Sequence, residues 1–199
     1  MGDIGHTTAS IQGSLGRIAD GNGRTFARDE LLESAIRRIR QMVRKEIARS
    51  PGVARWEEED DLVQEVLIRV DRAVQDARPE HVGQFFLIVG QHVRWAAVDL
   101  IRKHFGSHGI GNRHRTGMEP ASIAGHQDAD LAEQIDSVKL HEAVDRLDDE
   151  HKETWILHVY SGLRQETIAE MLKVSTKTVQ RRIARAKLSL AEMLDPSES

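Results

Sequence analysis

The chain has 199 residues, of which 39% are hydrophobic and 30% charged, as in a globular protein of one or two small domains. It contains no cysteine, which excludes disulfides and thiolate metal sites, and its aromatic content of 4% disfavours a β-sandwich or barrel. The formal net charge of −4 hides a segregation of signs, with acidic residues at 57–61 and 148–150 and basic residues near 94–115 and 173–187. This segregation predicts separate faces for DNA and for a protein partner.

Signals for export or membrane insertion are not apparent in the sequence. The first ten residues, MGDIGHTTAS, lack the basic and then apolar order of a signal peptide. Apolar runs stay well below the ~20 residues that a membrane span requires. Together with the lack of cysteine, these features predict a cytoplasmic protein.

Apolar residues at helical spacing predict helices from the N-terminus onward. Ile11, Leu15 and Ile18 could form one short amphipathic helix, closed by the turn signal Asp-Gly-Asn-Gly at 20–23. A second helix is predicted from about Phe26 to Arg49, and the following Ser-Pro-Gly ends it.

Two further helices complete a predicted N-terminal bundle. The first follows the acidic run 57–61, which suits the positive end of a helix dipole, and Arg78-Pro79 stops it. The second runs from Gln84 to His104 with most of its apolar residues facing inward. Residues 1–105 are therefore predicted to form one helical domain with a short N-terminal extension.

The sequence then changes character at 106–136, where glycines and scattered histidines suggest a flexible linker. Residues 137–199 are predicted to form a second helical domain, including a helix from Asp149 to Tyr160. Four residues, Leu188, Leu190, Met193 and Leu194, are expected to pack the last helix back onto the core. The predicted fold is all-α, with two small domains and no strand.

The stretch 164–187, RQETIAEMLKVSTKTVQRRIARAK, reads as two helical runs joined by a tight break. Lys173-Val174 makes the corner, and Ser175 is placed to cap the second helix. Val179 and Ile183 are predicted to point inward, while the outward face contains Thr176, Lys177, Thr178, Gln180, Arg181 and Arg182. Residues 171–191 include no acidic residue, whereas a solvated surface normally mixes signs. The pattern predicts a helix-turn-helix whose second helix enters a DNA major groove, against the alternative of an ordinary αα-corner.

An N-terminal helical domain that contains DLVQEV at 61–66, followed by a helix-turn-helix, resembles bacterial sigma factors of the extracytoplasmic-function group. The resemblance covers nearly the whole chain from about residue 8. The helix ending in VDLIRK at 98–103 resembles the part that reads the −10 promoter element, and TVQRRIARA at 178–186 resembles the −35 recognition helix. The resemblance implies a promoter-specificity subunit of RNA polymerase that needs no cofactor, with an anti-sigma factor as a possible further partner.

Three sets of site residues follow from this resemblance and from the side-chain chemistry. The −35 set is Ser175, Thr176, Lys177, Thr178, Gln180, Arg181, Arg182 and Arg185, with base contacts expected chiefly from the arginines, Lys177 and Gln180. The −10 set is Arg78, His81, Gln91, Arg94, Trp95, Arg102 and Lys103, and the loop 78–83 is expected to receive an unpaired base. The polymerase-binding set is Asp61, Gln64, Glu65 and Arg69. Trp95 is also consistent with plain core, and the polymerase set with a solvated helix face.

The sequence departs from the family pattern at the turn of the helix-turn-helix. Lys173 stands where glycine is common, so the turn must accept a side chain. Gln180-Arg181 replaces the more usual small or basic pair, which bears on the bases that are read.

Two other functions are compatible with parts of the sequence. A free-standing helix-turn-helix regulator would need a dimerisation surface or an effector pocket, and the first domain offers no obvious cofactor motif. A metal-dependent enzyme would use His104, His108, His114 and His126, but the sequence contains no HExxH motif and no matching carboxylates. We therefore expect neither catalysis nor a metal.

Overall fold

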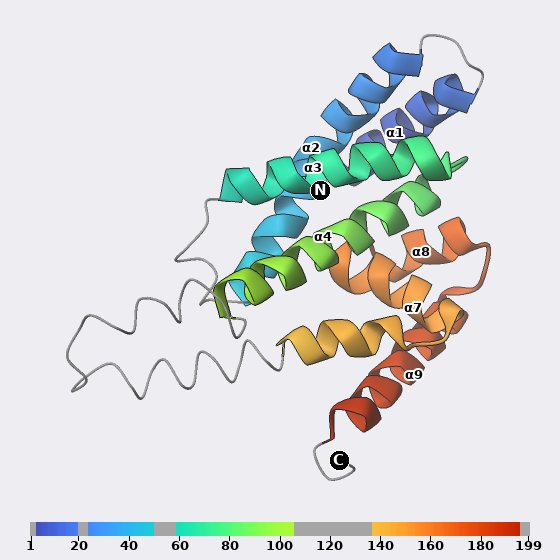
Figure 1. The fold of residues 1–199 in the computed structure, drawn as a ribbon. Coiled ribbons are helices and arrows are strands. Elements are labelled where there is room, and N and C mark those ends of the chain that lie inside the picture. The colour runs from blue at the N-terminus through green and yellow to red at the C-terminus, as the bar shows by residue number, and fades with distance from the viewer. Residues whose placement is uncertain (1–2, 20–23, 50–58, 106–136, 196–199) are drawn as a thin grey trace, which may run out of the picture.

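The computed structural model describes residues 3–19, 24–49, 59–105 and 137–195, and within these ranges the fold is all-α without strands, which confirms the predicted class (Figure 1). The predicted turn at 20–23, the helix stop after Arg49 and the linker 106–136 lie outside the described residues. In the described part, no helix is long and apolar enough to cross a membrane.

Four helices form the N-terminal segment: α1 (Asp3–Ala19), α2 (Arg24–Arg49), α3 (Glu59–Ala77) and α4 (Val82–Phe105). The predicted helices of this segment are confirmed, although α1 is longer than expected and α4 begins two residues early. Each helix buries an apolar stripe, because residues three and four apart share one face. On α3 this stripe consists of Leu62, Val63, Val66, Val70 and Val74.

The C-terminal segment begins with a helix over residues 137–145, followed by α7 (Asp149–Trp155) and the π-helical turn η3 (Ile156–Tyr160). The single helix predicted over 149–160 therefore changes its winding at Ile156. The wider turn buries Ile156, Leu157 and Tyr160. Two more helices, α8 (Gln165–Leu172) and α9 (Thr176–Leu194), complete the chain.

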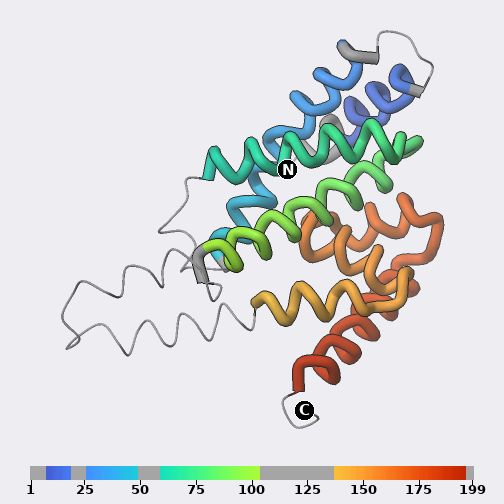
Figure 2. The backbone as a smooth tube through the Cα atoms, in the orientation of Figure 1, coloured from blue at the N-terminus to red at the C-terminus, as the bar shows by residue number. Residues whose placement is uncertain are grey.

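The two segments pack against each other, and α4 lies between the N-terminal helices and the C-terminal ones (Figures 1 and 2). One apolar cluster contains buried residues from α1 to α4 and also Leu157, Leu163, Ile168, Val179 and Ile183 of the C-terminal segment. A second cluster joins α9 to α7, η3 and the helix at 137–145. The hydrophobic core is thus continuous across the predicted domain boundary.

Gly90 of α4 marks the closest approach between the two segments. A Cβ at this position would stand 2.7 Å from Ile156 Cγ2 and 2.8 Å from Ser161 Oγ, which is too close for real atoms. The Ser161 hydroxyl also donates a hydrogen bond of 3.0 Å to the carbonyl of Phe86. Only glycine therefore lets η3 and the residue after it rest directly on the backbone of α4.

The end of α9 corrects one expectation from the sequence. Leu190 is buried, as predicted, but Leu188, Met193 and Leu194 are exposed by 56%, 40% and 36%. Their positions fall outside the inner stripe of α9, which consists of Val179, Ile183, Ala186 and Leu190. The last two turns therefore present apolar side chains to solvent.

Candidate nucleic-acid interface

The turn between α8 and α9 lies where the sequence predicts it. Lys173 adopts a left-handed conformation with φ of 53°, and its N–H donates back to α8. The Ser175 hydroxyl accepts a hydrogen bond of 3.1 Å from the Thr178 N–H, which confirms the predicted N-cap. Val179 and Ile183 lie in the same apolar cluster as Ile168, so the inner faces of the two helices meet as expected.

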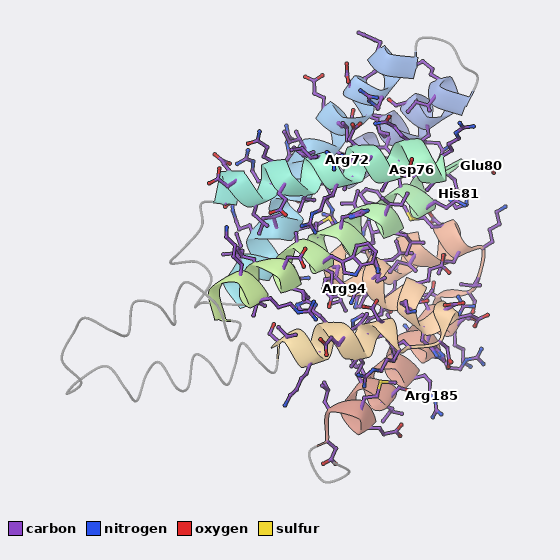
Figure 3. All side chains as sticks on the ribbon, viewed as in Figure 1. Arg72, Asp76, Glu80, His81, Arg94 and Arg185 are labelled. Atoms are coloured by element: carbon purple, nitrogen blue, oxygen red, sulfur yellow. The ribbon has the colours of Figure 1, made fainter. Side chains whose placement is uncertain are left out.

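The outer face of α9 presents polar and basic side chains to solvent. Lys177, Gln180, Arg181 and Arg185 are exposed, while Ser175 is exposed at the cap and Thr176 and Thr178 are half-buried. Figure 3 shows Arg185 on α9, directed away from the other helices. Consequently, most of the predicted −35 set shares one accessible, positively charged helix surface.

Arg182 is the exception, and its predicted outward orientation is wrong. Its side chain is 13% exposed and forms an ion pair of 2.9 Å with Glu150 of α7. Position 182 lies on the flank of α9 that packs against α7, so the guanidinium meets an acidic helix start. Nearby, burial raises the pKa of the Glu153 carboxyl, while the charges of Arg182 and His81 act in the opposite direction.

The loop between α3 and α4 presents the first residues of the predicted −10 set. Arg78 adopts φ of 47°, and buried Pro79 follows it, so the chain turns sharply at the end of α3. The side chains of Arg78, Glu80 and His81 are exposed. Figure 3 shows Glu80 and His81 together at this end of the molecule. The loop is therefore accessible in the structure.

The middle of α4 differs, because the C-terminal segment covers it. Arg94 is fully buried: its guanidinium donates to the His141 carbonyl and pairs with Asp145, both on the helix at 137–145. In Figure 3 this side chain lies between α4 and that helix. In this arrangement Arg94 is not available to a DNA strand.

The remaining α4 residues of the −10 set differ in how far the C-terminal segment covers them. Trp95 is 42% exposed, its ring meets His92 edge to face, and burial lowers the pKa of His92. Gln91 is half-buried, Lys103 is exposed, and Arg102 pairs with Glu142 at 2.8 Å. A hollow of about 340 Å³ between α4 and the helix at 137–145 is lined by Arg69, Arg94, Trp95, Val98, Asp99, Arg102, His141, Glu142 and Asp145.

The residues predicted to bind polymerase lie along the outer face of α3. Asp61, Gln64 and Glu65 are exposed, while Arg69 is half-buried and bonds to Glu65 at 2.5 Å and to Asp99 of α4 at 2.8 Å. These residues recur at spacings of three and four, so they form one stripe. Ile68, which sequence reasoning missed, is 48% exposed beside them.

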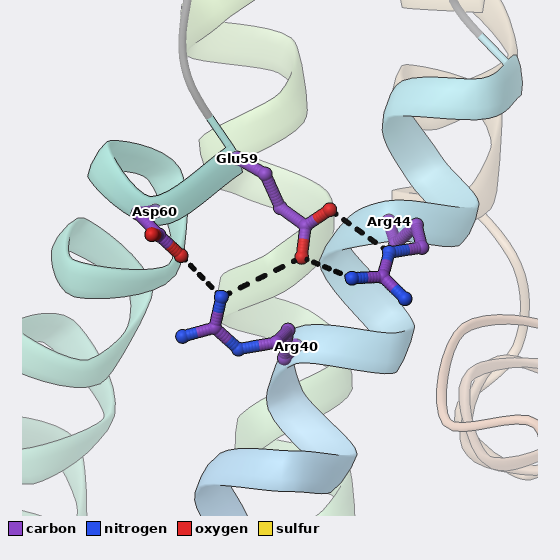
Figure 4. A network of polar contacts seen from close by, with 4 residues as sticks. All are labelled: Arg40, Arg44, Glu59 and Asp60. Atoms are coloured by element: carbon purple, nitrogen blue, oxygen red, sulfur yellow. Dashed lines mark hydrogen bonds and ion pairs between the residues drawn. The ribbon is translucent and has the colours of Figure 1, made fainter.

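The acidic start of α3 is held by arginines of α2 (Figure 4). Arg44 donates two hydrogen bonds of 2.9 Å to the carboxylate of Glu59, and these bonds lower the pKa of Glu59. Arg40 pairs with Asp60 and lies 3.7 Å from Glu59. Part of the acidic run thus fixes α3 on α2, so it is not all available to a partner.

The metal hypothesis gains no support in the described part of the chain. No group of three or more His, Asp or Glu side chains there could hold a metal ion. His108, His114 and His126 lie outside the described residues.

Comparison with known proteins identifies one family. The family model described as ECF sigma factor matches residues 9–195, which is nearly the whole chain. No curated protein matches the sequence.

Proposed function

The chain belongs to the ECF sigma factor family, a family of transcription factors that act with RNA polymerase, and we propose that it directs initiation by gripping promoter DNA at two points. The observation that carries this proposal is the outer face of α9, where exposed Lys177, Gln180, Arg181 and Arg185 share one surface behind a capped, rigid turn. Such a helix fits the major groove.

The proposed −35 contacts follow from the donors on α9. An arginine pairs with two acceptors of guanine and a glutamine with adenine, so Arg181 and Gln180 are the expected base readers. Thr176, Thr178, Lys177 and the Ser175 cap can reach phosphates, which fixes the register of the helix. Arg185 stands a turn further on and is proposed to contact the backbone. Arg182 is proposed to contact bases as well, after its ion pair with Glu150 is replaced by a contact with DNA.

The proposed −10 contacts lie on the loop 78–83 and along α4. The exposed side chains of Arg78 and His81 are expected to border an unpaired base, and Trp95 offers an aromatic face for stacking. Arg94, Arg102, Lys103 and Gln91 would follow the strand. The outer stripe of α3, with Asp61, Gln64, Glu65 and Arg69, is proposed to dock on core polymerase.

The two sets of contacts cannot both form while the chain is closed. Elements centred near −10 and −35 lie about 25 base pairs apart, or roughly 85 Å along B-DNA. In the structure Met171 of α8 lies against Gly83 at the start of α4, with 3.3 Å from its Cβ to a Cβ placed there. We therefore propose that the two segments separate on polymerase. The number of residues in the segment 106–136 is sufficient for this, since a fully extended chain of that length would span about 100 Å.

The direct test is selection of DNA by the reconstituted holoenzyme. Core polymerase is mixed with the full chain and a randomised duplex library, and the retained sequences are read. We expect two enriched blocks at one fixed spacing, and specific transcripts that start downstream of them. Failure of the chain to bind core polymerase would reject the proposal, and binding to a single operator without polymerase would support a free-standing regulator instead.

A matched pair of variants locates the upstream contact. Arg181→Ala should relax base selection within the −35 block and leave the −10 block unchanged, because it removes an exposed donor from α9. Arg146→Ala removes an exposed arginine outside α9 and should leave both blocks intact. Equal effects of the two changes would mean that general charge, not base reading, governs the selection.

Two further expectations depend on the same proposal. A protein that works on polymerase and promoter DNA is expected in the cytoplasm. An anti-sigma factor remains a prediction from the family resemblance, and purification of the tagged chain from its own cells, followed by identification of stoichiometric partners, tests it.

A further inference from the structure

The loop 78–83 is held from a distant part of the chain by Gln12 of α1. The Gln12 side-chain amide donates to the Glu80 carbonyl at 3.2 Å, and its oxygen accepts from the Val82 N–H at 3.0 Å. One side chain therefore bonds to both sides of His81. The Val82 N–H belongs to the first turn of α4, where helices leave their N–H groups without internal partners, so Gln12 supplies a bond that the helix itself cannot make.

Bonds within the loop complete its support. The Gln84 side-chain oxygen accepts a hydrogen bond from the Glu80 N–H at 2.8 Å, and the backbone N–H of Gln84 donates to His81 Nδ1 at 3.3 Å. The arrangement resembles a capping box, except that the Gln84 side chain bonds to Glu80, the residue before His81. At the other end, the Arg78 N–H donates to the Val74 carbonyl at 3.0 Å. The backbone is thus bonded along the loop, while the side chains of Arg78, Glu80 and His81 are exposed, the last with Nδ1 bonded to the Gln84 N–H.

Gln12 itself is held firmly, because α1 is anchored to α2. Its neighbours Ile11 and Leu15 are buried in the main apolar cluster. The Ser10 and Ser34 hydroxyls lie 2.9 Å apart, and Arg17 pairs with Glu30, so polar contacts between α1 and α2 add to the apolar ones. A rigid helix therefore presents the amide of Gln12 to the loop.

From this geometry we infer that Gln12 is a positioning residue for promoter reading: it holds the loop 78–83 in the conformation that receives an unpaired base. The inference rests on the proposed function of this loop. A preformed site binds more tightly and discriminates better, since it does not have to be ordered during binding. The helix expected from the sequence to be a short extension thus becomes part of the reading site.

Two variants of the full chain distinguish the two hydrogen bonds of Gln12. Gln12→Ala removes both hydrogen bonds, whereas Gln12→Glu keeps an acceptor for the Val82 N–H and loses the donor to the Glu80 carbonyl. The matched control is Gln75→Ala, because Gln75 is also exposed and its amide bonds to Asp71 within its own helix. Circular dichroism and thermal melts verify that each variant folds.

The first measurement is hydrogen exchange of the loop amides in the free protein. We expect the Val82 amide to exchange roughly tenfold faster in Gln12→Ala, as loss of one hydrogen bond implies. Gln12→Glu should fall between this variant and the wild type, and Gln75→Ala should match the wild type. An unchanged exchange rate of the Val82 amide in Gln12→Ala would show that the Gln12 hydrogen bonds do not hold the loop in solution. That result would overturn the inference.

The second measurement is base discrimination by the holoenzyme. Open-complex formation is compared on the selected promoter and on the same promoter with single substitutions in the −10 element. Gln12→Ala should reduce the preference for the selected bases severalfold and leave binding to a duplex with only the −35 element unchanged. Faster exchange with unchanged discrimination would make Gln12 merely structural. If the wild-type holoenzyme selects no promoter, the proposed function fails, and the role of Gln12 in promoter reading fails with it. The exchange measurement would still show whether Gln12 holds the loop.

Discussion

The two proposed DNA-reading helices are presented in opposite ways. The outer face of α9 is exposed and basic, and Arg182 alone among its proposed readers has an ion pair, with Glu150, in the described structure. The middle of α4 is covered: Arg94 is fully buried against His141 and Asp145, and Arg102 pairs with Glu142. The closed chain thus presents one reading surface and encloses much of the other.

This difference suggests an order of events. Coulomb attraction can bring exposed α9 to DNA at once, but α4 can read bases only after the C-terminal segment leaves. Separation gives up the apolar contacts of Leu157, Leu163 and Ile168, so binding to polymerase must offset their loss. The polar contacts of Arg94 and Arg102 are charge-assisted, and DNA phosphates can replace Asp145 and Glu142 as their partners. Single substitutions can alter the cover of α4 or the exposed face of α9 separately.

The largest effect is expected from Gly90→Ala. The new methyl would meet Ile156 and Ser161 within 2.8 Å, so closure should weaken by about 1–3 kcal/mol, as overpacking does. The open form should not suffer, because alanine favours the helix. Small-angle scattering should show a larger radius of gyration, and core polymerase should bind more tightly.

Gly16→Ala is the matched control for this change. Gly16 is also helical, but a Cβ there has nothing within 4 Å. The substitution should raise the melting temperature slightly and leave the radius unchanged. Expansion in both variants would mean that closure does not depend on the contact at Gly90.

The next effect is expected from Arg94→Met, which keeps the buried length of the side chain and removes its charge. Loss of the charge-assisted bonds to His141 and Asp145 should weaken closure by about 2 kcal/mol. Exchange of amides in the helix at 137–145 measures this loss. If Arg94 also contacts the −10 strand after opening, the variant will open more readily and yet form fewer open complexes.

The two neighbouring arginines on α9, Arg181 and Arg182, are expected to differ in their effect on DNA binding. Arg181→Ala should weaken binding to a −35 duplex by about 1–3 kcal/mol, the usual value of a base-reading arginine. Arg182→Ala should cost less, because wild-type Arg182 must first give up its ion pair with Glu150. Fluorescence anisotropy at two salt concentrations measures both. A larger loss at Arg182 would place the main base contact on the flank of α9.

The smallest effect concerns the turn that orients α9. Lys173 is held at φ of 53°, a conformation that costs little for glycine. Lys173→Gly should therefore raise the free energy of unfolding by about 0.5–1 kcal/mol in denaturant titrations. A loss of stability would show that the lysine side chain stabilises the turn by contacts that outweigh the strain.

Local features of the fold were predictable from the sequence. The presence of α2, the stop at Arg78-Pro79 and the cap at Ser175 depend on neighbours in the chain, so periodicity and capping rules find them. The corner at Lys173-Val174 was also predicted, from its place between two helical runs, whereas the left-handed φ of Lys173 is known only from the structure.

The long-range contacts were not predictable from the same patterns. Arg94 looks like a surface residue in the sequence, because only a helix some 50 residues further on buries it. No periodic pattern in the sequence relates Gln12 to Glu80. The exposure of Leu188 and Met193 depends on how far the partner helices extend along α9. Contacts between distant segments decide these positions.

The central claim, that the segments separate when both promoter elements are held, is tested most directly by a distance between them. The chain has no native cysteine, so Gly16→Cys and Glu192→Cys can carry spin labels on α1 and α9 without competing sites. Double electron–electron resonance should give one narrow distribution in the free protein. On the promoter-bound holoenzyme, the distance should increase by several tens of ångströms, on the order of the separation of the two elements. An unchanged distance in that complex would contradict the two-point grip.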